Sequence, residues 1–116
     1  DIYVSEGDYP KALQAVKEIE RIAPDGLSIY QYRVLAKVYY LQHKIDSAQY
    51  YFNIASELAE DIRDDAQLAY LSFQIELASG NSEQAANSIN EYIWLSDSIS
   101  RMVVSQSATA AEAKIL

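Results

Sequence analysis

Tyr32-Arg-Val-Leu-Ala-Lys-Val-Tyr39 opens the stretch of sequence that decides the fold, and Ala48 and Phe52 close it. In its first half, large apolar side chains and one small one recur at positions i, i+3, i+4 and i+7. They are Tyr32, Leu35, Ala36 and Tyr39. Because an α-helix has 3.6 residues per turn, this spacing places all four side chains on one face of a helix.

A second apolar stripe follows after a short gap, at Ala48, Phe52 and Ala55. Residues 42–46, which separate the two stripes, are too few for anything but a tight turn between antiparallel helices. Small side chains at Ala36 and Ala48 allow these helices to approach closely, and Phe52 is expected to fill the space beside that contact together with the two tyrosines of the first stripe. The stretch therefore predicts a helix hairpin.

The same spacing resembles a tetratricopeptide repeat, with Tyr32 in place of the usual tryptophan and Ala36 in place of glycine. This resemblance implies an all-α fold in which antiparallel helix hairpins stack into a right-handed solenoid. Two incomplete copies flank the central one. The first is Ala12 and Val16 followed by Pro24, and the second is Tyr70, Phe73 and Leu77 followed by Ala85 and Ile89.

We therefore expect one domain over residues 1–116. It consists of a partial first repeat (1–26), a second repeat (27–62), a degenerate third repeat (63–97) and a C-terminal capping helix (98–116). The expected helices of the first two repeats cover residues 10–23, 27–42 and 45–60. A helix break at Ser96-Asp97-Ser98 would separate the third repeat from a last helix over 99–114, since serine and aspartate are common N-caps.

One alternative is a single helix that continues through this serine-rich segment. Heptad spacing favours it, and the positions concerned are Ala85, Ile89, Tyr92, Ser96, Ile99 and Val103. A straight helix of this kind would offer a seam for dimerisation instead of a lid over the end of the repeats.

The composition also favours helices and excludes several classes of function. Half of the residues are hydrophobic, with only three glycines and two prolines. The absence of cysteine excludes disulfides, thiolate zinc sites and cysteine nucleophiles. A net charge of −8 has the wrong sign for binding nucleic acid. No apolar run reaches the roughly 18 residues of a membrane span, so direct membrane insertion by this sequence is not expected.

No catalytic, cofactor-binding or metal-binding residues emerge, and we do not expect an enzyme. His43 is the single histidine and occupies the turn of the central hairpin, where an exposed position is expected. The acidic residues between 57 and 65 lack the central glycine and the alternating oxygen ligands of a calcium loop. These acids are better explained as a solvated junction, with Asp64 and Asp65 opposing the dipole of the following helix.

The resemblance instead implies a concave groove lined by the first helix of each hairpin. The residues that it assigns to the groove are Tyr30, Arg33, Lys37, Tyr40, Leu68, Leu71 and Ile75. Arg33 and Lys37 lie one helical turn apart, a pair that suits a carboxylate of a protein or peptide partner. The competing interpretation is that both are ordinary solvated charges.

On the third repeat, Tyr70, Phe73 and Leu77 are expected to form the core stripe. The leucines and isoleucine assigned to the groove would then give this helix a second apolar side, which either the last helix or a partner must cover.

These observations predict a protein-binding or peptide-binding scaffold module of a longer protein, since the chain starts within a repeat. Two alternatives stay open. One is a structural or oligomerisation module that forms a homodimer through its C-terminal helix. The other is the sensor region of a bacterial signalling protein, because Tyr92-Ile-Trp-Leu-Ser-Asp-Ser-Ile99 is similar to the segment that closes tetratricopeptide arrays in bacterial sensor kinases and transcription regulators. The sequence does not distinguish between the bacterial cell envelope and the cytoplasm as the compartment of this protein.

Overall fold

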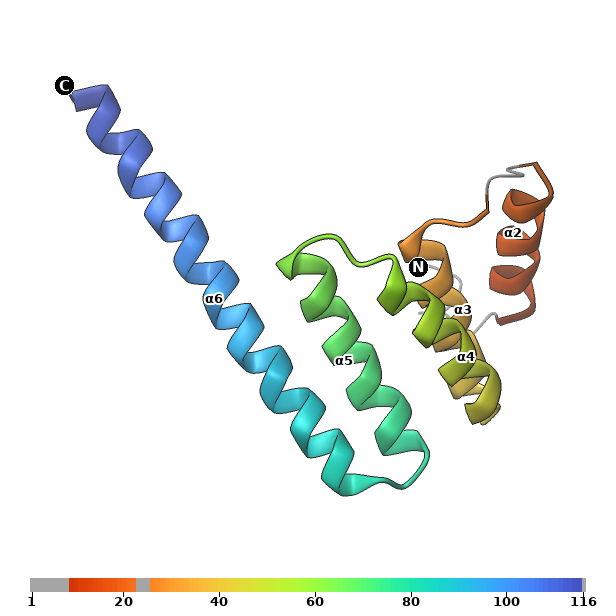
Figure 1. The fold of residues 1–116 in the computed structure, drawn as a ribbon. Helices are drawn as coiled ribbons and strands as arrows, with labels where there is room; N and C mark the ends of the chain where they lie inside the picture. Colours follow the sequence, from red (N-terminus) through yellow and green to blue (C-terminus); the bar gives the residue numbers. More distant parts are fainter. Residues whose placement is uncertain (1–8, 23–25, 116) are drawn as a thin grey trace.

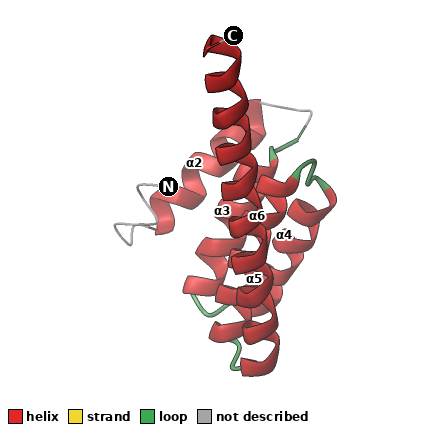
Figure 2. Cartoon of the chain, turned by 90° about the vertical axis from the view of Figure 1, so that its left-hand side faces the viewer, coloured by secondary structure: helices red, strands yellow, loops and turns green. Residues whose placement is uncertain are grey.

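The structure is a computed structural model that describes residues 9–22 and 26–115. These residues form the helices α2 (Tyr9–Ile22), α3 (Ile29–Leu41), α4 (Ile45–Glu57), α5 (Ile62–Ala78) and α6 (Ser82–Ile115), and none of them lies in a strand (Figure 2). The predicted all-α class is confirmed. Expectations for residues 1–8 and 23–25, including the loop at Pro24, lie outside the described residues.

Each helix packs against the next one along the chain, and α3 also packs against α5. Figure 1 shows α6 at one edge of the molecule and α2 at the other. At the α2 edge, Val16 is buried in a cluster with Val34, Leu35 and Val38 of α3. Of the stripe expected along the helix over 10–23, only the Val16 side chain is described.

The central hairpin forms as its spacing predicts. Ala36 of α3 and Ala48 of α4 are both fully buried in one cluster, where their small side chains let the helices come close. Ser28 caps α3 through a reciprocal pair of hydrogen bonds with Gln31, which explains why this helix begins at Ile29 and not at residue 27. The turn to α4 is made with a positive φ of 60° at His43, which is exposed as expected.

Phe52 and Tyr39 pack beside this contact as expected, and Tyr51, which was not expected there, joins them. Tyr51 stacks on Tyr39 and Tyr32, with ring centroids 5.5 and 6.3 Å apart respectively. Phe52 lies one position further round α4 and packs against the cluster that contains Ala36 and Ala48 together with Leu71 and Ile75 of α5. Because successive helical residues point about 100° apart, Tyr51 and Phe52 extend in different directions from α4, and the ring stack on α3 is made by Tyr51.

Replacing Ala48 by leucine is expected to lower the free energy of unfolding by about 1–3 kcal/mol, because no space remains between α3 and α4 for a larger side chain. Urea denaturation measures this loss. An unchanged midpoint would contradict the close helix contact.

The core stripe of α5 is not the one predicted. Leu77 is 57% exposed and Tyr70 is 40% exposed, whereas Leu68, Leu71 and Ile75 are buried. Helix α5 carries apolar residues on more than one side because it is covered twice, by α3 and α4 on one side and by α6 on another. The α6 side uses small residues, with Ala66 and Ala69 packed against Leu95. A hydrogen bond of 2.9 Å between the hydroxyls of Ser72 and Ser88 links the same two helices.

The predicted break at residues 96–98 is absent, and so is a separate capping helix over 98–116. Helix α6 runs without interruption from Ser82 to Ile115, as the alternative of a single continuous helix predicted. Two of the three polar side chains at the expected break have partners within the helix. The Ser98 hydroxyl donates to the carbonyl oxygen of Trp94 at 2.9 Å, and Asp97 pairs with Arg101 at 3.2 Å. The helix continues past α5 as a protruding arm (Figure 1).

Candidate binding groove

A groove lies between α3 and α5, with a cavity volume of about 240 Å³. Each helix contributes four residues to its lining, spaced so that they share one face of that helix. Those of α3 are Tyr30, Arg33, Val34 and Lys37, and those of α5 are Gln67, Tyr70, Leu71 and Gln74. The direct packing of α3 on α5 holds the two walls in place.

Four of the seven residues assigned to the groove from the sequence line it. They are Tyr30, Arg33, Lys37 and Leu71. The other three lie in the core, where Tyr40, Leu68 and Ile75 are only 9%, 6% and 1% exposed. Leu71 and Ile75 pack together with Tyr40 against the central hairpin, so the second apolar side of α5 is covered from within the chain and not by a partner.

Three α5 residues that line the groove were not assigned to it from the sequence, namely Gln67, Tyr70 and Gln74. Gln67 and Gln74 stand seven residues apart with Tyr70 between them, which is the spacing of one helical stripe. This stripe could have been recognised as a mixed polar and aromatic face. Repeat spacing instead assigned Tyr70 to the core, where the structure leaves it 40% exposed.

Arg33 occupies the centre of the groove. Its Nη1 donates a hydrogen bond to Oε1 of Gln67 at 3.3 Å, and its guanidinium carbon lies 5.7 Å from the centre of the Tyr30 ring. The Nε atom of Arg33 is buried and has no hydrogen-bond partner. Buried donors of this kind are normally paired, and leaving one unpaired costs about 1–3 kcal/mol or more.

The charge of the groove is opposite to that of the chain. Arg33 and Lys37 project from α3 one turn apart, and no aspartate or glutamate contributes to the lining. The ion pairs found within the described residues, Glu18–Arg21 and Asp97–Arg101, lie on α2 and α6 and involve neither cation. On a chain with net charge −8, the groove is therefore a local positive site.

A second hollow adjoins the groove and shares Arg33 and Gln67 with it. Its other walls come from the start of α5 and the middle of α6, including Arg63 and Ser96. One carboxylate lies here, that of Asp64, which already accepts a hydrogen bond from the backbone N–H of Glu60 at 3.0 Å. The positive surface thus continues from α3 toward α6.

Other kinds of site find no support in the geometry. Among the described residues, no group of three histidine, cysteine or acidic side chains could hold a metal ion. In the acidic segment, Asp61 caps α5 by accepting a hydrogen bond from the backbone N–H of Asp64 at 2.9 Å. In the same part of the chain, every helix is too short or too polar to cross a membrane.

Comparison of the chain with protein-family models, with curated proteins and with solved structures finds no match. The function of this chain is therefore inferred from the groove itself, from its positive charge and its aromatic walls.

Proposed function

We propose that this chain is a non-catalytic peptide-binding module of the tetratricopeptide type, and that it holds a carboxylate-bearing segment of a partner protein in the groove between α3 and α5. The observation that carries the proposal is the guanidinium of Arg33. It lies beside Lys37 in a groove without acidic lining residues, so the lining supplies no carboxylate for either positive charge.

A carboxylate fits this arrangement better than a neutral group would. Hydrogen bonds in which both partners are charged are shorter and stronger than neutral ones, and arginine can hold both oxygens of a carboxylate at once. Lys37, one turn along α3, adds a second positive charge at the same edge. An acidic group bound here would be attracted by both charges, which no acidic side chain of the lining neutralises.

The aromatic walls suit the apolar side chains that flank such an acid. Tyr30 is 49% exposed and Tyr70 is 40% exposed, and they line the groove from opposite helices. Gln67 and Gln74, on either side of Tyr70 along α5, can pair with the backbone of an extended peptide, since an amide group both donates and accepts. The bound segment would therefore be extended, with an acidic residue or free C-terminus next to an apolar side chain.

The tetratricopeptide part of the proposal is supported by the two successive helix pairs, α3 with α4 and α5 with α6, and by the direct contact between the first helices of those pairs. In such a stack each pair buries its apolar face against its neighbours, and the first helices form the binding surface. The spacing of Ala36 and Ala48, both fully buried, agrees with this arrangement.

An array of short synthetic peptides with varied sequence tests the proposed function. The chain is expected to retain peptides that contain aspartate, glutamate or a free C-terminus beside a large apolar residue, and to lose them when each acid is replaced by its amide. Selection of basic peptides, or equal retention of acidic peptides and their amide counterparts, would contradict the proposal.

A further inference from the structure

The face of α6 that points away from α5 carries a regular pattern of exposed side chains. The opposite face is already occupied, because Leu95 and Ile99 pack with α5. The heptad positions expected to form a dimer interface therefore pack largely against the chain's own helices, and Ala85 is only 2% exposed. A seam for a second copy has to lie elsewhere on the helix.

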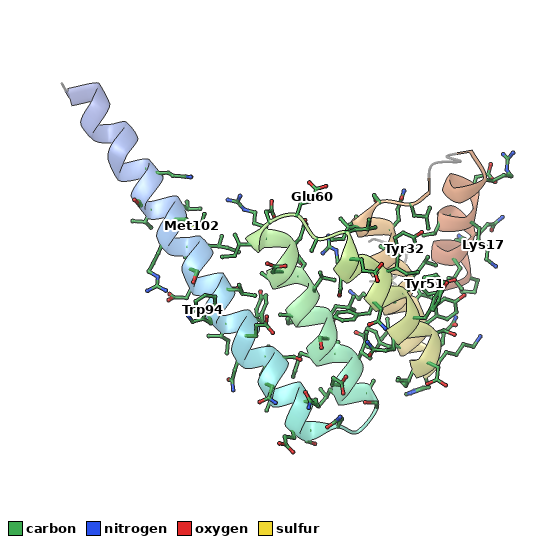
Figure 3. The ribbon with its side chains drawn as sticks, viewed as in Figure 1. Lys17, Tyr32, Tyr51, Glu60, Trp94 and Met102 are labelled. Atoms are coloured by element: carbon green, nitrogen blue, oxygen red, sulfur yellow. The ribbon has the colours of Figure 1, made fainter. Side chains whose placement is uncertain are left out.

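Four residues of α6 mark this outward face. Trp94 and Val104 are 63% and 67% exposed, and the side chains of Asp97 and Arg101 are 64% and 68% exposed. At 3.6 residues per turn, the four positions fall within an arc of about 80° on the side opposite Ile99. Trp94 is labelled on α6 in Figure 3, where this helix forms the edge of the molecule.

The pattern is self-complementary when read in opposite directions. Asp97 and Arg101 stand two residues on either side of Ile99, and Trp94 and Val104 stand five residues on either side of it. If two copies of α6 lay antiparallel with a twofold axis on this outward face, level with residue 99, each aspartate would face an arginine, and each tryptophan would face a valine. A parallel pair would instead bring like charges together, which is unfavourable.

We propose that α6 pairs antiparallel with α6 of a second copy of the chain through Trp94, Asp97, Arg101 and Val104, giving a homodimer with the two helix bundles on opposite sides. The symmetric contact uses the same patch on both copies, as a twofold interface requires. The proposal does not depend on the groove, which is lined by α3 and α5.

The length of α6 gives a second reason for a partner. It has 34 residues against 17 in α5, and residues 100–107 are exposed throughout. A helical arm of roughly 12–15 residues without tertiary packing is only marginally stable in water. Pairing with a second copy would bury Val104 of this arm against Trp94 of the other chain and so stabilise the arm.

A concentration series followed by sedimentation and fluorescence tests the pairing. Because one helix pair makes a small interface, we expect a weak dimer that accumulates between about 1 μM and 1 mM. Trp94 is the single tryptophan of the chain, so its emission should shift to shorter wavelength as the dimer forms. A chain that stays monomeric over this range would overturn the proposal and leave the face to a different protein.

Charge reversal then tests the antiparallel orientation. Asp97→Arg and Arg101→Asp should each weaken the dimer about tenfold, because each variant places two like-charge contacts across the axis. The double variant, with both charges exchanged, should return to within about threefold of the original chain, and a mixture of the two single variants should form a mixed dimer.

The control is Glu91→Arg, a reversal on the flank of α6 that lines a hollow with residues of α4 and α5. It should leave the dimer unchanged. Circular dichroism of every variant checks that the helices are intact, as expected for side chains this exposed. Single reversals without effect, or a double variant as weak as the single ones, would overturn the antiparallel pairing.

Discussion

Replacing Ile75 by alanine is expected to lower the free energy of unfolding by about 2–5 kcal/mol. Ile75 is 1% exposed and is one of the two largest fully buried side chains among the described residues. It packs with Ala36, Ala48 and Leu71, where α3, α4 and α5 meet. Removing it leaves a cavity that three helices must share, and urea denaturation followed by circular dichroism measures the loss.

Leu77→Ala provides the matched control, since it removes a similar side chain two residues later on the same helix. Leu77 is 57% exposed, so the expected change is only about 0.5 kcal/mol. Equal losses for the two variants, or a larger one for Leu77→Ala, would contradict the observed orientation of α5. Such a result would favour the core stripe expected from the repeat spacing.

Reversing both cations of the groove, Arg33→Glu with Lys37→Glu, is expected to weaken binding of an acidic peptide selected on the array by at least about 100-fold. Each replacement removes a charged donor and introduces a carboxylate that repels the ligand. The fold should tolerate the change, because both side chains are half-buried at the groove and neither belongs to the buried clusters. Fluorescence anisotropy with a labelled peptide measures the affinity.

The control for this variant carries the same change in net charge at a distance from the groove. This control is the double variant Lys11→Glu with Lys17→Glu, which reverses two charges at exposed positions of α2. Binding should then fall by less than about threefold, because exposed charges beyond a Debye length of about 8 Å are largely screened at physiological salt. Comparable losses in the two double variants would mean that the peptide responds to overall charge and not to the groove.

The central hairpin shows what could be predicted from sequence. Small residues at Ala36 and Ala48 within two apolar stripes have few alternative uses, and a turn as short as that before Ile45 leaves only antiparallel pairing. Both alanines are fully buried as predicted. The stacking of Tyr51 on Tyr32 and Tyr39 was not predicted, because Tyr51 lies outside the stripe of Ala48, Phe52 and Ala55.

Helix α5 shows why the rest could not be predicted. Its apolar residues lie on more than one side, and periodicity identifies a helix without saying which side faces which neighbour. The choice depends on α6, whose path was itself mispredicted. Ser96 to Ser98 look like a cap in isolation, but Asp97 finds Arg101 one turn later, and the hydroxyl of Ser98 bonds to the helix backbone.

The groove was partly predictable for the same reasons. Arg33 and Lys37 were assigned from their positions in the repeat, and both line the groove. The assignment failed for Ile75 and Leu68, because it carried the repeat register onto a helix that is turned differently. The buried, unpaired Nε of Arg33 has no counterpart in the sequence pattern, since it depends on the packing of α3 against α5.

The most direct measurement is a nuclear magnetic resonance titration of the isotope-labelled chain with a selected acidic peptide and with its amide counterpart. The acidic peptide should shift the backbone amide signals of residues 30–37 in α3 and 67–74 in α5, with saturation, and the amide peptide should leave them unchanged at the same concentration. Shifts confined to α2 or to the outward face of α6, or equal responses to the two peptides, would contradict a carboxylate-binding groove between α3 and α5.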